Sequence, residues 1–452
     1  MGRKKKMSLE IVHPQSAGID VGSKSHFVSI GQSTEDVREF GVYASDLLSL
    51  AQWLLSNEIK HVAMESTGNY WQNLYAELIS HGLEVILVNG KFTKQMKGKK
   101  TDVLDCMWIQ KLHSLGLLSG SFLPDENTAK LRTYTRQRKK LLEQAAQASL
   151  RMQKYLKLLN FRLDVVVKDI CGLTGMKIIK DIVENDNLDG QALAQHRHYN
   201  CRKSEAEIAK ALQGNNKEEY LFGLRQDYET YHFFKEKVEE CEAQIANFFD
   251  RYFDEQEQVV DDLPIEKPYK RRNKNNPKNM DLNILSYQYF GGVDLLAIEG
   301  VSYSTVLTIM SEVGAGGMHR FQSAKQFASW LRLAPNNKIS GGKTLSNRTP
   351  KGSGRLKIAL RNAANAIGNL KEGHLATFFK RIAYKKGRQI AITATARKLA
   401  MIIWNMVTKK QPYNPPEPYL FLDQKRKLGI VKRIRKKMAK FDISTNDLQL
   451  KT

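Results

Sequence analysis

Residues 17–31 read AGIDVGSKSHFVSIG, and this stretch decides the fold of the N-terminal part of the chain. Its apolar residues predict a buried strand, a turn and a second strand. Apolar residues at helical spacing follow at 46–56 and 70–80, and the short runs HVAMEST (61–67) and LEVILVN (83–89) predict further strands. Strands that alternate with helices predict an α/β sheet covered by helices.

Four carboxylates stand out by their positions in this pattern. Asp20 lies within the first predicted strand, Glu65 ends another, and Asp102 and Asp105 lie on one face of a predicted helix over 102–118. A buried strand rarely tolerates an unpaired carboxylate, because removing its charge from water is costly. A hard divalent cation such as Mg²⁺ takes oxygen ligands and compensates such charges. Each carboxylate alone has a simpler explanation in a turn, a helix cap or a solvated charge, but together they predict a metal site.

The charge of the chain indicates a polyanionic partner. Among 452 residues there are 71 Lys and Arg against 47 Asp and Glu, a formal net charge of +24. Lys and Arg that neutralise phosphates release condensed counterions, which drives binding to nucleic acid of any sequence. Charge alone leaves open a ribosome-associated protein or one that is merely soluble and basic.

The cysteines and the apolar runs limit the class of protein further. Four cysteines are scattered without a CxxC pair, so we expect neither a disulfide framework nor a zinc ribbon, and a reducing, cytosolic compartment fits best. No run of about 18 apolar residues predicts a transmembrane helix. The start, MGRKKKMSLE, is basic without a following apolar region, so it predicts a short arm rather than a signal peptide.

Long helices are predicted in the middle of the chain, over 129–161 and within 204–253. They could pair as an antiparallel coiled coil or a helical arm, or belong to an ordinary helical bundle. Between the helices and the C-terminal part, IEKPYKRRNKNNPKNMDLN predicts a linker. The expected segments are a basic arm (1–14), an α/β domain (15–125), a helical or coiled-coil region (126–264), a basic linker (265–283), a mostly α-helical domain (284–410) and a basic tail (411–452).

The C-terminal domain contains a second segment that could bind nucleic acid. LLAIEGVSYSTVLTIMSEVG (295–314) predicts two helices around a turn at 299–301, similar to a helix-hairpin-helix whose turn presents backbone N–H groups to phosphate. A simple helical hairpin in the core is the alternative. Residues 336–354 are rich in Gly, Ser, Asn, Lys and Arg, which suits a phosphate-binding loop or a flexible solvated one. A helix over 355–370 follows, with its apolar face expected to point inward through Leu356, Leu360, Ala363, Ala364 and Ile367.

Three blocks around the carboxylates resemble a known family. GIDVGSKSHFVSI (18–30), AMESTGNYW (63–71) and KTDVLDCMWIQKL (100–112) closely resemble the blocks of the DEDD-type insertion-sequence transposases, which are related to the Piv DNA invertases. The resemblance implies an RNase-H-like, RuvC-like fold in which Asp20, Glu65, Asp102 and Asp105 form a catalytic tetrad that binds Mg²⁺, with Mn²⁺ as an alternative.

The resemblance extends to the C-terminal block, LRLAP–SGGK–KG–LK–LRNAA, and covers about residues 15–125 and 290–370. It implies that Ser340 is the nucleophile and that the carboxylates act with it, from the same or another subunit. The basic residues expected to bind nucleic acid are Lys99, Lys100, Arg348, Lys351, Arg355 and Arg361.

The function implied is a bacterial, nucleoid-associated transposase that cuts and rejoins DNA at the ends of an insertion sequence and at its target. A structured RNA encoded by the element would guide it, and a homo-oligomer, dimer or tetramer, would hold the DNA sites together. Two alternatives remain open from the sequence. One is a RuvC-like junction-resolving nuclease that uses metal-activated water and does not need Ser340, and the other is a non-catalytic nucleic-acid-binding protein.

Overall fold

The computed structural model describes residues 10–93, 101–255, 275–415 and 420–441. The chain divides into two compact units, residues 1–123 and 124–452. Residues 126–264 and 284–410 both fall within the second unit, and the bounds expected for the separate domains stay predictions.

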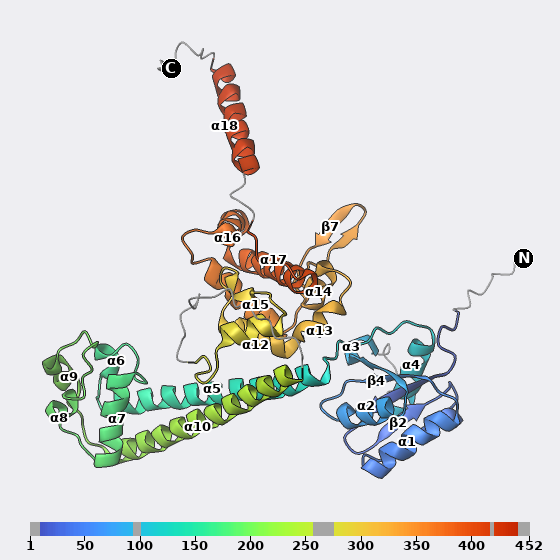
Figure 1. Cartoon of the computed structure of the whole chain (residues 1–452), viewed down its shortest axis with the longest axis horizontal. Helices are drawn as coiled ribbons and strands as arrows, with labels where there is room; N and C mark the ends of the chain where they lie inside the picture. The colour runs from blue at the N-terminus through green and yellow to red at the C-terminus, as the bar shows by residue number, and fades with distance from the viewer. Residues whose placement is uncertain (1–9, 94–100, 256–274, 416–419, 442–452) are drawn as a thin grey trace, which may run out of the picture. The chain divides into compact units, whose positions relative to one another are not determined.

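A five-stranded mixed sheet forms the centre of the first unit, in the order β3-β2-β1-β4-β5 (Figure 1). β1 to β3 pair antiparallel, whereas β1, β4 and β5 run parallel. The strands are β1 (Ser16–Val21), β2 (His26–Ser29), β3 (Val37–Phe40), β4 (His61–Glu65) and β5 (Glu84–Val88). The helices of this unit are the 3-10 helix η1 (Thr34–Asp36), α1 (Ala44–Ser56), α2 (Trp71–Ser80), α3 (Gly90–Thr93) and α4 (Asp102–Ser114).

The two faces of this sheet carry different helices (Figure 1). Ala17, Ile19 and Val21 alternate along β1 and join Val62 and Met64 of β4 in a core with α1 and α2. α4 packs against β1, β2 and β4 on the opposite face. The predicted α/β sheet covered by helices is confirmed. The sequence did not predict β3, whose central residues are charged and exposed instead of alternating with apolar ones.

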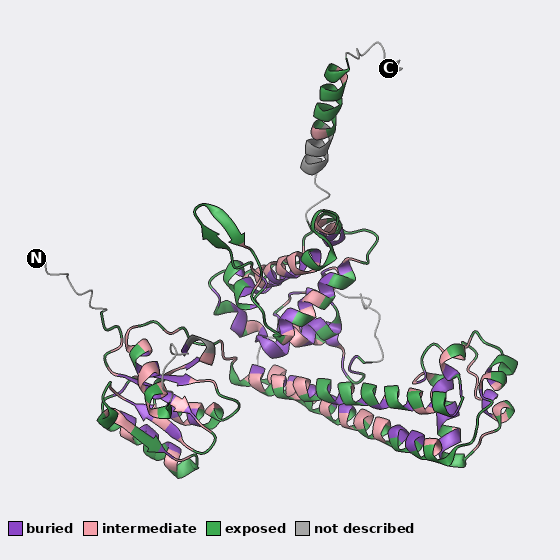
Figure 2. Ribbon diagram, turned by 180° about the vertical axis from the view of Figure 1, so that it is seen from behind, coloured by how far each residue is buried: buried purple, intermediate pink, exposed green. Residues whose placement is uncertain are grey.

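Two long helices form an arm in the second unit. α5 (Glu126–Leu158) and α10 (Glu218–Asp254) run antiparallel and side by side (Figures 1 and 2). Their apolar residues recur every three or four positions and are buried where the helices meet, while the outer faces are exposed (Figure 2). The helices expected over 129–161 and within 204–253 therefore pair as a two-helix arm.

Four short helices close the end of this arm. They are α6 (Leu163–Val166), α7 (Leu173–Asn185), α8 (Gly190–Ala194) and α9 (Glu205–Ala211). They share a core with the end of α5 and the start of α10, in which Phe161, Ile178 and Leu193 are completely buried. This small core explains how the chain reverses direction between the two long helices.

The C-terminal part is mostly helical, as predicted. Its helices are α11 (Leu282–Tyr289), the 3-10 helix η2 (Leu295–Ala297), α12 (Tyr303–Glu312), α13 (Gly314–His319), α14 (Ala324–Trp330), α15 (Arg355–Ile367), α16 (His374–Lys386), α17 (Arg388–Lys409) and α18 (Leu420–Lys440). α17 lies against α14, α15 and α16, and α12 packs on both α15 and α5. The apolar face predicted for α15 is buried at all five expected positions.

Two local features differ from the sequence predictions. The segment 336–354 contains a β-hairpin of β6 (Lys338–Ser340) and β7 (Lys343–Ser346) rather than a loop throughout. The first helix expected before the turn at 299–301 is only the 3-10 turn η2. Gly300 in that turn has φ +74°, and a side chain there would lie 2.8 Å from the carbonyl oxygen of Ala363. The turn is therefore packed against α15.

Among the helices that the structure describes, α17 alone is long and apolar enough to cross a membrane by length and composition. Its apolar residues, including Ala396, Leu399 and Ile403, are buried against neighbouring helices. Core helices of water-soluble proteins commonly share this composition, so α17 is adequately explained as a packing element.

Candidate active site

Asp20 and Glu65 occupy neighbouring positions at the ends of two parallel strands. Ile19 of β1 pairs with Met64 of β4, so one further step along the same register brings Asp20 beside Glu65. Ile19 and Met64 point into the core with α1 and α2. Because successive side chains of a strand alternate between faces, Asp20 and Glu65 belong to the face that α4 covers.

A glycine allows α4 to approach this face closely. A Cβ atom at Gly18 would lie 2.5 Å from the carbonyl oxygen of Cys106 and 2.7 Å from the Cα atom of Gln110. Real side chains do not make such contacts, so only glycine lets the α4 backbone rest on β1 at this point. The Gln110 amide also donates a hydrogen bond of 3.3 Å to the carbonyl oxygen of Ser16.

The first turn of α4 carries the other two carboxylates. Thr101 is the N-cap, its hydroxyl accepting a hydrogen bond from the Leu104 N–H, and Asp102 and Asp105 lie in the first turn. Acidic residues at this position stabilise a helix through its dipole. Asp102 is exposed, and Asp105 is half-buried.

The thiol of Cys106 lies within electrostatic reach of two of these carboxylates. Burial raises the pKa of Cys106 to about 12, and the negative charges of Asp20 and Asp105 contribute to the rise. Asp20 on β1 and Asp105 on α4 therefore both lie near the same buried sulfur. The structure thus brings Asp20, Glu65 and Asp105 to one face of the sheet, from three different elements.

Glu65 is held in place by the turn that follows β5. The Thr93 hydroxyl donates a hydrogen bond of 2.7 Å to the Glu65 carboxylate. A side chain at Gly90 would lie 2.8 Å from the Glu65 carboxyl carbon, so the start of α3 rests directly against this carboxylate. Neither Thr93 nor Gly90 carried a signal in the sequence, because their effect on Glu65 depends on the parallel pairing of β4 with β5.

The donor set suits a hard cation, since it consists of carboxylate oxygens alone. Within the described ranges, however, no group of three or more His, Cys, Asp or Glu side chains is close enough to hold a metal ion. The carboxylates share a face of the sheet but do not form a finished ligand set.

Ser340 lies at the end of β6, next to the tip of the β6–β7 hairpin. Gly341 and Gly342 form the tip with φ values of +55° and +73°, a backbone conformation that glycine adopts without strain. Ser340 pairs with Lys343, and both are exposed. Ile339 and Leu345 are also exposed, so the hairpin presents apolar residues around the serine.

The basic residues expected around a scissile phosphate are spread over this region. Arg348 and Lys351 are exposed on the segment after the hairpin. Arg361 donates a hydrogen bond of 2.9 Å to the Thr393 hydroxyl of α17, whereas Arg355 begins α15. Lys99 and Lys100 lie outside the described residues.

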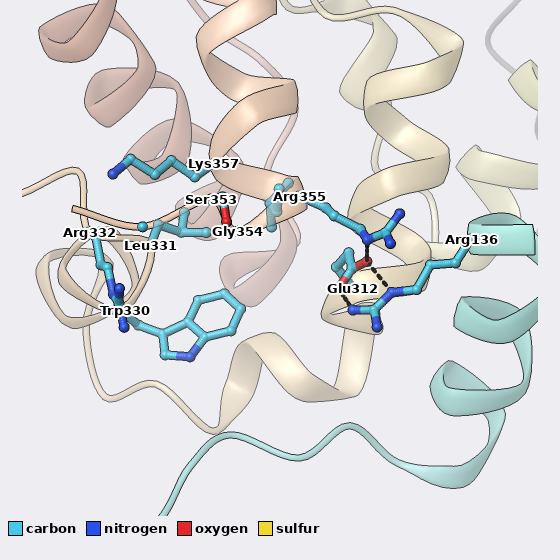
Figure 3. Close-up of a pocket in the computed structure, with 11 residues that line it drawn as sticks. Arg136, Glu312, Trp330, Leu331, Arg332, Ser353, Gly354, Arg355 and Lys357 are labelled. Carbon is cyan, nitrogen blue, oxygen red and sulfur yellow. Dashed lines mark hydrogen bonds and ion pairs between the residues drawn. The ribbon is translucent and has the colours of Figure 1, made fainter. Parts of the chain in front are cut away.

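A cavity of about 410 Å³ opens at the start of α15 (Figure 3). Of the predicted basic residues, Arg355 lines it. Its other cationic residues are Arg136, Arg332 and Lys357, which were not predicted from the sequence because they come from segments far apart in the chain. Arg332 and Lys357 lie within the LRLAP and LK blocks, which is the signal that could have identified them.

Comparisons with known proteins match the two parts of the chain that carry these features. A family model described as "Transposase", for the DEDD domain of the IS110 type, matches residues 17–161. A second model, described as "Transposase IS116/IS110/IS902 family", matches residues 294–380. Together the two models match just over half of the chain. The chain belongs to the IS110/IS116 transposase family.

Curated relatives of this family are similar over part of the chain. A "Probable family 20 transposase" of Pseudomonas aeruginosa is 26% identical over 125 residues, which are 27% of this chain and 36% of that protein. The "Transposase for insertion sequence element IS1111A" of Coxiella burnetii is 29% identical over 121 residues, 26% of this chain and 33% of that protein. The matched region spans about a third of the length of these relatives.

Proposed function

We propose that this chain is a transposase that cuts and rejoins DNA at the ends of an insertion sequence and at its target. The observation that carries the proposal is the placement of Asp20 beside Glu65 at the ends of β1 and β4, on the face where α4 brings Asp105. Both family models describe transposases, and each covers one of the two parts that the proposed reaction uses.

We infer that the first unit has an RNase-H-like, RuvC-like fold. Its mixed sheet of three antiparallel and two further parallel strands, with acidic residues at the ends of the central strands, supports this inference. Asp20, Glu65, Asp102 and Asp105 would hold Mg²⁺ or Mn²⁺. A divalent cation bound there would stabilise the charge that develops on the phosphate oxygens during transfer.

The chain's own residues prepare this site in specific ways. Thr93 fixes one oxygen of Glu65, and Gly18 sets how closely the first turn of α4 approaches Asp20. Asp102 and Asp105, three residues apart, share one face of α4, so a small rotation of that helix moves both together. In this proposal, Thr93, Gly18 and the spacing on α4 hold the carboxylates on one face of the sheet, and the metal ion would draw them together into a ligand set.

Ser340 is proposed as the nucleophile. Its exposed position at a hairpin tip allows a DNA strand to reach the hydroxyl. In the proposed step the Ser340 oxygen forms an ester bond with phosphorus while one bridging P–O bond breaks; the serine proton passes to a base and the leaving sugar oxygen gains a proton. The reverse reaction with a second strand rejoins the DNA. A serine hydroxyl needs activation at neutral pH, and the carboxylates of the first unit, from the same or another subunit, are proposed to supply it.

The partners proposed are DNA, a structured RNA encoded by the element, and further copies of the chain in a dimer or tetramer. The net charge of +24 supports binding to nucleic acid. RNA guidance is tested by expressing the chain with and without the non-coding sequence that flanks its gene. Transposition that depends on a transcript of that sequence would support it, and equal transposition without the transcript would refute it.

A strand-cleavage assay on element-end DNA with a divalent cation tests the chemistry. We expect Asp20→Asn and Glu65→Gln to abolish cleavage, whereas Glu39→Gln, which changes an exposed glutamate on β3, leaves it unchanged. We expect Ser340→Ala to abolish the covalent protein–DNA adduct, and Ser346→Ala on the same hairpin to retain it. Cleavage by Ser340→Ala at the unmodified rate would instead favour the junction-resolving nuclease. DNA binding without cleavage by the unmodified protein, unchanged by Asp20→Asn, would favour a non-catalytic nucleic-acid-binding protein.

A further inference from the structure

The cavity at the start of α15 is built from parts of the chain that are distant in sequence. Arg136 comes from α5, Glu312 from α12 and Trp330 from α14, and residues 352–357 complete the wall (Figure 3). Its volume of about 410 Å³ is within the ~300–1,000 Å³ typical of sites for small ligands. The cavity therefore has room for one nucleotide.

The cavity carries an excess of positive charge. Four cationic side chains line it, Arg136, Arg332, Arg355 and Lys357, against the single carboxylate of Glu312. Glu312 is already bound by Arg136 through hydrogen bonds of 2.9 and 2.7 Å, and Arg132 lies 3.6 Å from it. Arg355 of α15 also lies 4.0 Å from Glu312. The one negative charge in the cavity is thus matched by arginines of α5 and α15 and does not compete with an incoming anion.

Arg332 and Lys357 are the cations left without a carboxylate. Arg332 donates to the carbonyl oxygen of Lys351 at 2.6 Å, and Lys357 to that of Pro350 at 3.1 Å; neither forms an ion pair with any described residue. Lys357 is buried, and its pKa is lowered by that burial and by the positive charges of Arg361 and Arg332. A bound anion would relieve this repulsion.

The position of Arg332 is fixed by the backbone around it. Arg332 has φ +55°, an uncommon conformation for a residue with a side chain. A Cβ atom at Gly352 would lie 2.8 Å from the Arg332 Cδ atom, so the arginine stem lies directly over the glycine. Arg332 is exposed, but its hydrogen bond to the Lys351 carbonyl oxygen and its contact with Gly352 hold its side chain beside the cavity wall.

Two further features of the wall suit a nucleotide. Gly354 is the N-cap of α15 and offers no side-chain acceptor, so the first N–H groups of this 13-residue helix remain available to an anion. The Trp330 indole is backed by Phe327, with near-parallel rings 5.9 Å apart, and it also lines the cavity (Figure 3). Aromatic side chains of this kind stack on unpaired bases irrespective of sequence.

We propose that this cavity binds one unstacked nucleotide of a single-stranded nucleic acid. Its phosphate would lie against Arg332, Lys357 and the first turn of α15, and its base would stack on Trp330. A base within a duplex is already stacked on its neighbours, so duplex DNA would not use the Trp330 wall. This inference rests on the proposed function only because it assumes that the chain binds nucleic acid.

Equilibrium binding of the full-length chain to labelled oligonucleotides tests the proposal. The probes are a short single-stranded DNA, an RNA of the same sequence and the matching DNA duplex. We expect Trp330→Leu to weaken binding to single strands about tenfold without changing its salt dependence, because stacking involves no charge. We expect Arg332→Asn to weaken it and to reduce the slope of log K against log salt by about 0.7, the value for one phosphate contact. Asn tolerates the positive φ at this position.

The controls separate this cavity from the general charge of the surface. Lys325→Gln removes an exposed cation from the same helix as Trp330 and should leave single-strand affinity within twofold. Arg355→Gln, a half-exposed lining residue, gives a second charge variant should Arg332→Asn fold poorly. A stronger effect on DNA than on RNA would identify a DNA strand as the ligand, and the reverse an RNA.

Equal weakening of duplex and single strands by Trp330→Leu and Arg332→Asn, or no weakening beyond that of Lys325→Gln, would overturn the proposal. Binding requires neither strand cleavage nor the carboxylates, so an Asp20→Asn protein should still show the pattern. Loss of cleavage by that variant and loss of nucleotide binding in the cavity are therefore independent results.

Discussion

Gly18 of β1 lies directly beneath Cys106 of α4, where a Cβ atom would come within 2.5 Å of the Cys106 carbonyl oxygen. This contact sets the height of α4 above the sheet and hence the distance between Asp20 and Asp105. We expect Gly18→Ala to destabilise the protein by about 1–3 kcal/mol, typical of overpacking, and to impair cleavage of element-end DNA. Denaturant unfolding and the cleavage assay measure both effects.

A matched control for this substitution exists in the same unit. A Cβ atom at Gly120 would meet only Ile86, at an ordinary 3.5 Å. We expect Gly120→Ala to leave stability and cleavage nearly unchanged. Similar losses in the two variants would show that close approach of α4 is not the cause.

A substitution at Thr93 tests whether its hydrogen bond to the Glu65 carboxylate positions that side chain. Thr93→Val keeps the shape of the side chain but removes the donor to the Glu65 carboxylate. A hydrogen bond to a charged group contributes about 1.5–3 kcal/mol, so we expect cleavage to fall about tenfold or more if this positioning matters in the transition state. Thr67→Val, an exposed threonine just after β4, is the control. Equal cleavage by both variants would remove Thr93 from the site.

The arm of α5 and α10 contains a buried ion pair. Arg138 donates to Glu242 at 2.9 and 2.6 Å, and their side chains are 9% and 3% exposed. We expect Arg138→Met to cost about 3–5 kcal/mol in the free energy of unfolding, because Glu242 would be left buried without its partner. Adding Glu242→Met should restore most of this loss. Failure of the double variant to recover would mean that the other hydrogen bonds of the two residues, to the Asn275 carbonyl oxygen and from the Lys278 N–H, cause the loss.

An exposed pair provides the comparison. Lys203 and Glu207 are 2.7 Å apart on α9, with side chains about half exposed. We expect Lys203→Met to change stability by less than about 1 kcal/mol, since water screens such pairs. Urea unfolding of both variants under one buffer condition makes the contrast direct.

His113 should make the stability depend on acid pH. Burial lowers its pKa from 6.5 to about 4, with smaller contributions from the positive charges of His13 and His61. The unfolded chain therefore binds this proton more readily, so the folded state loses stability as the pH falls from about 6.5 to about 4, by roughly 3 kcal/mol in total. Unfolding measured across that range should show the decline.

Variants assign this pH dependence to the histidines. We expect His113→Gln to flatten the profile between these pH values, whatever its effect on stability at neutral pH. His13→Gln should reduce the decline only partly, because it removes a neighbouring charge and leaves the burial. An unchanged profile in His113→Gln would place the acid sensitivity elsewhere.

Local elements of this protein follow from its amino-acid sequence alone. Alternating apolar residues around Asp20 predicted β1 and β2, and helical spacing predicted the buried face of α15. These features follow from periods of two and 3.6 residues, which depend only on neighbours along the chain. The order of the carboxylate blocks was likewise readable, as was the serine block that the second family model matches.

Only the tertiary structure decided which of these residues meet. Asp20 lies beside Glu65 because β1 and β4 pair in a particular register, and Asp105 joins them because Gly18 admits α4. The cavity depends even more on tertiary packing, since Arg136 and Lys357 line it from α5 and α15. Contacts between such distant segments depend on how helices pack in three dimensions, and no local period in the sequence encodes them.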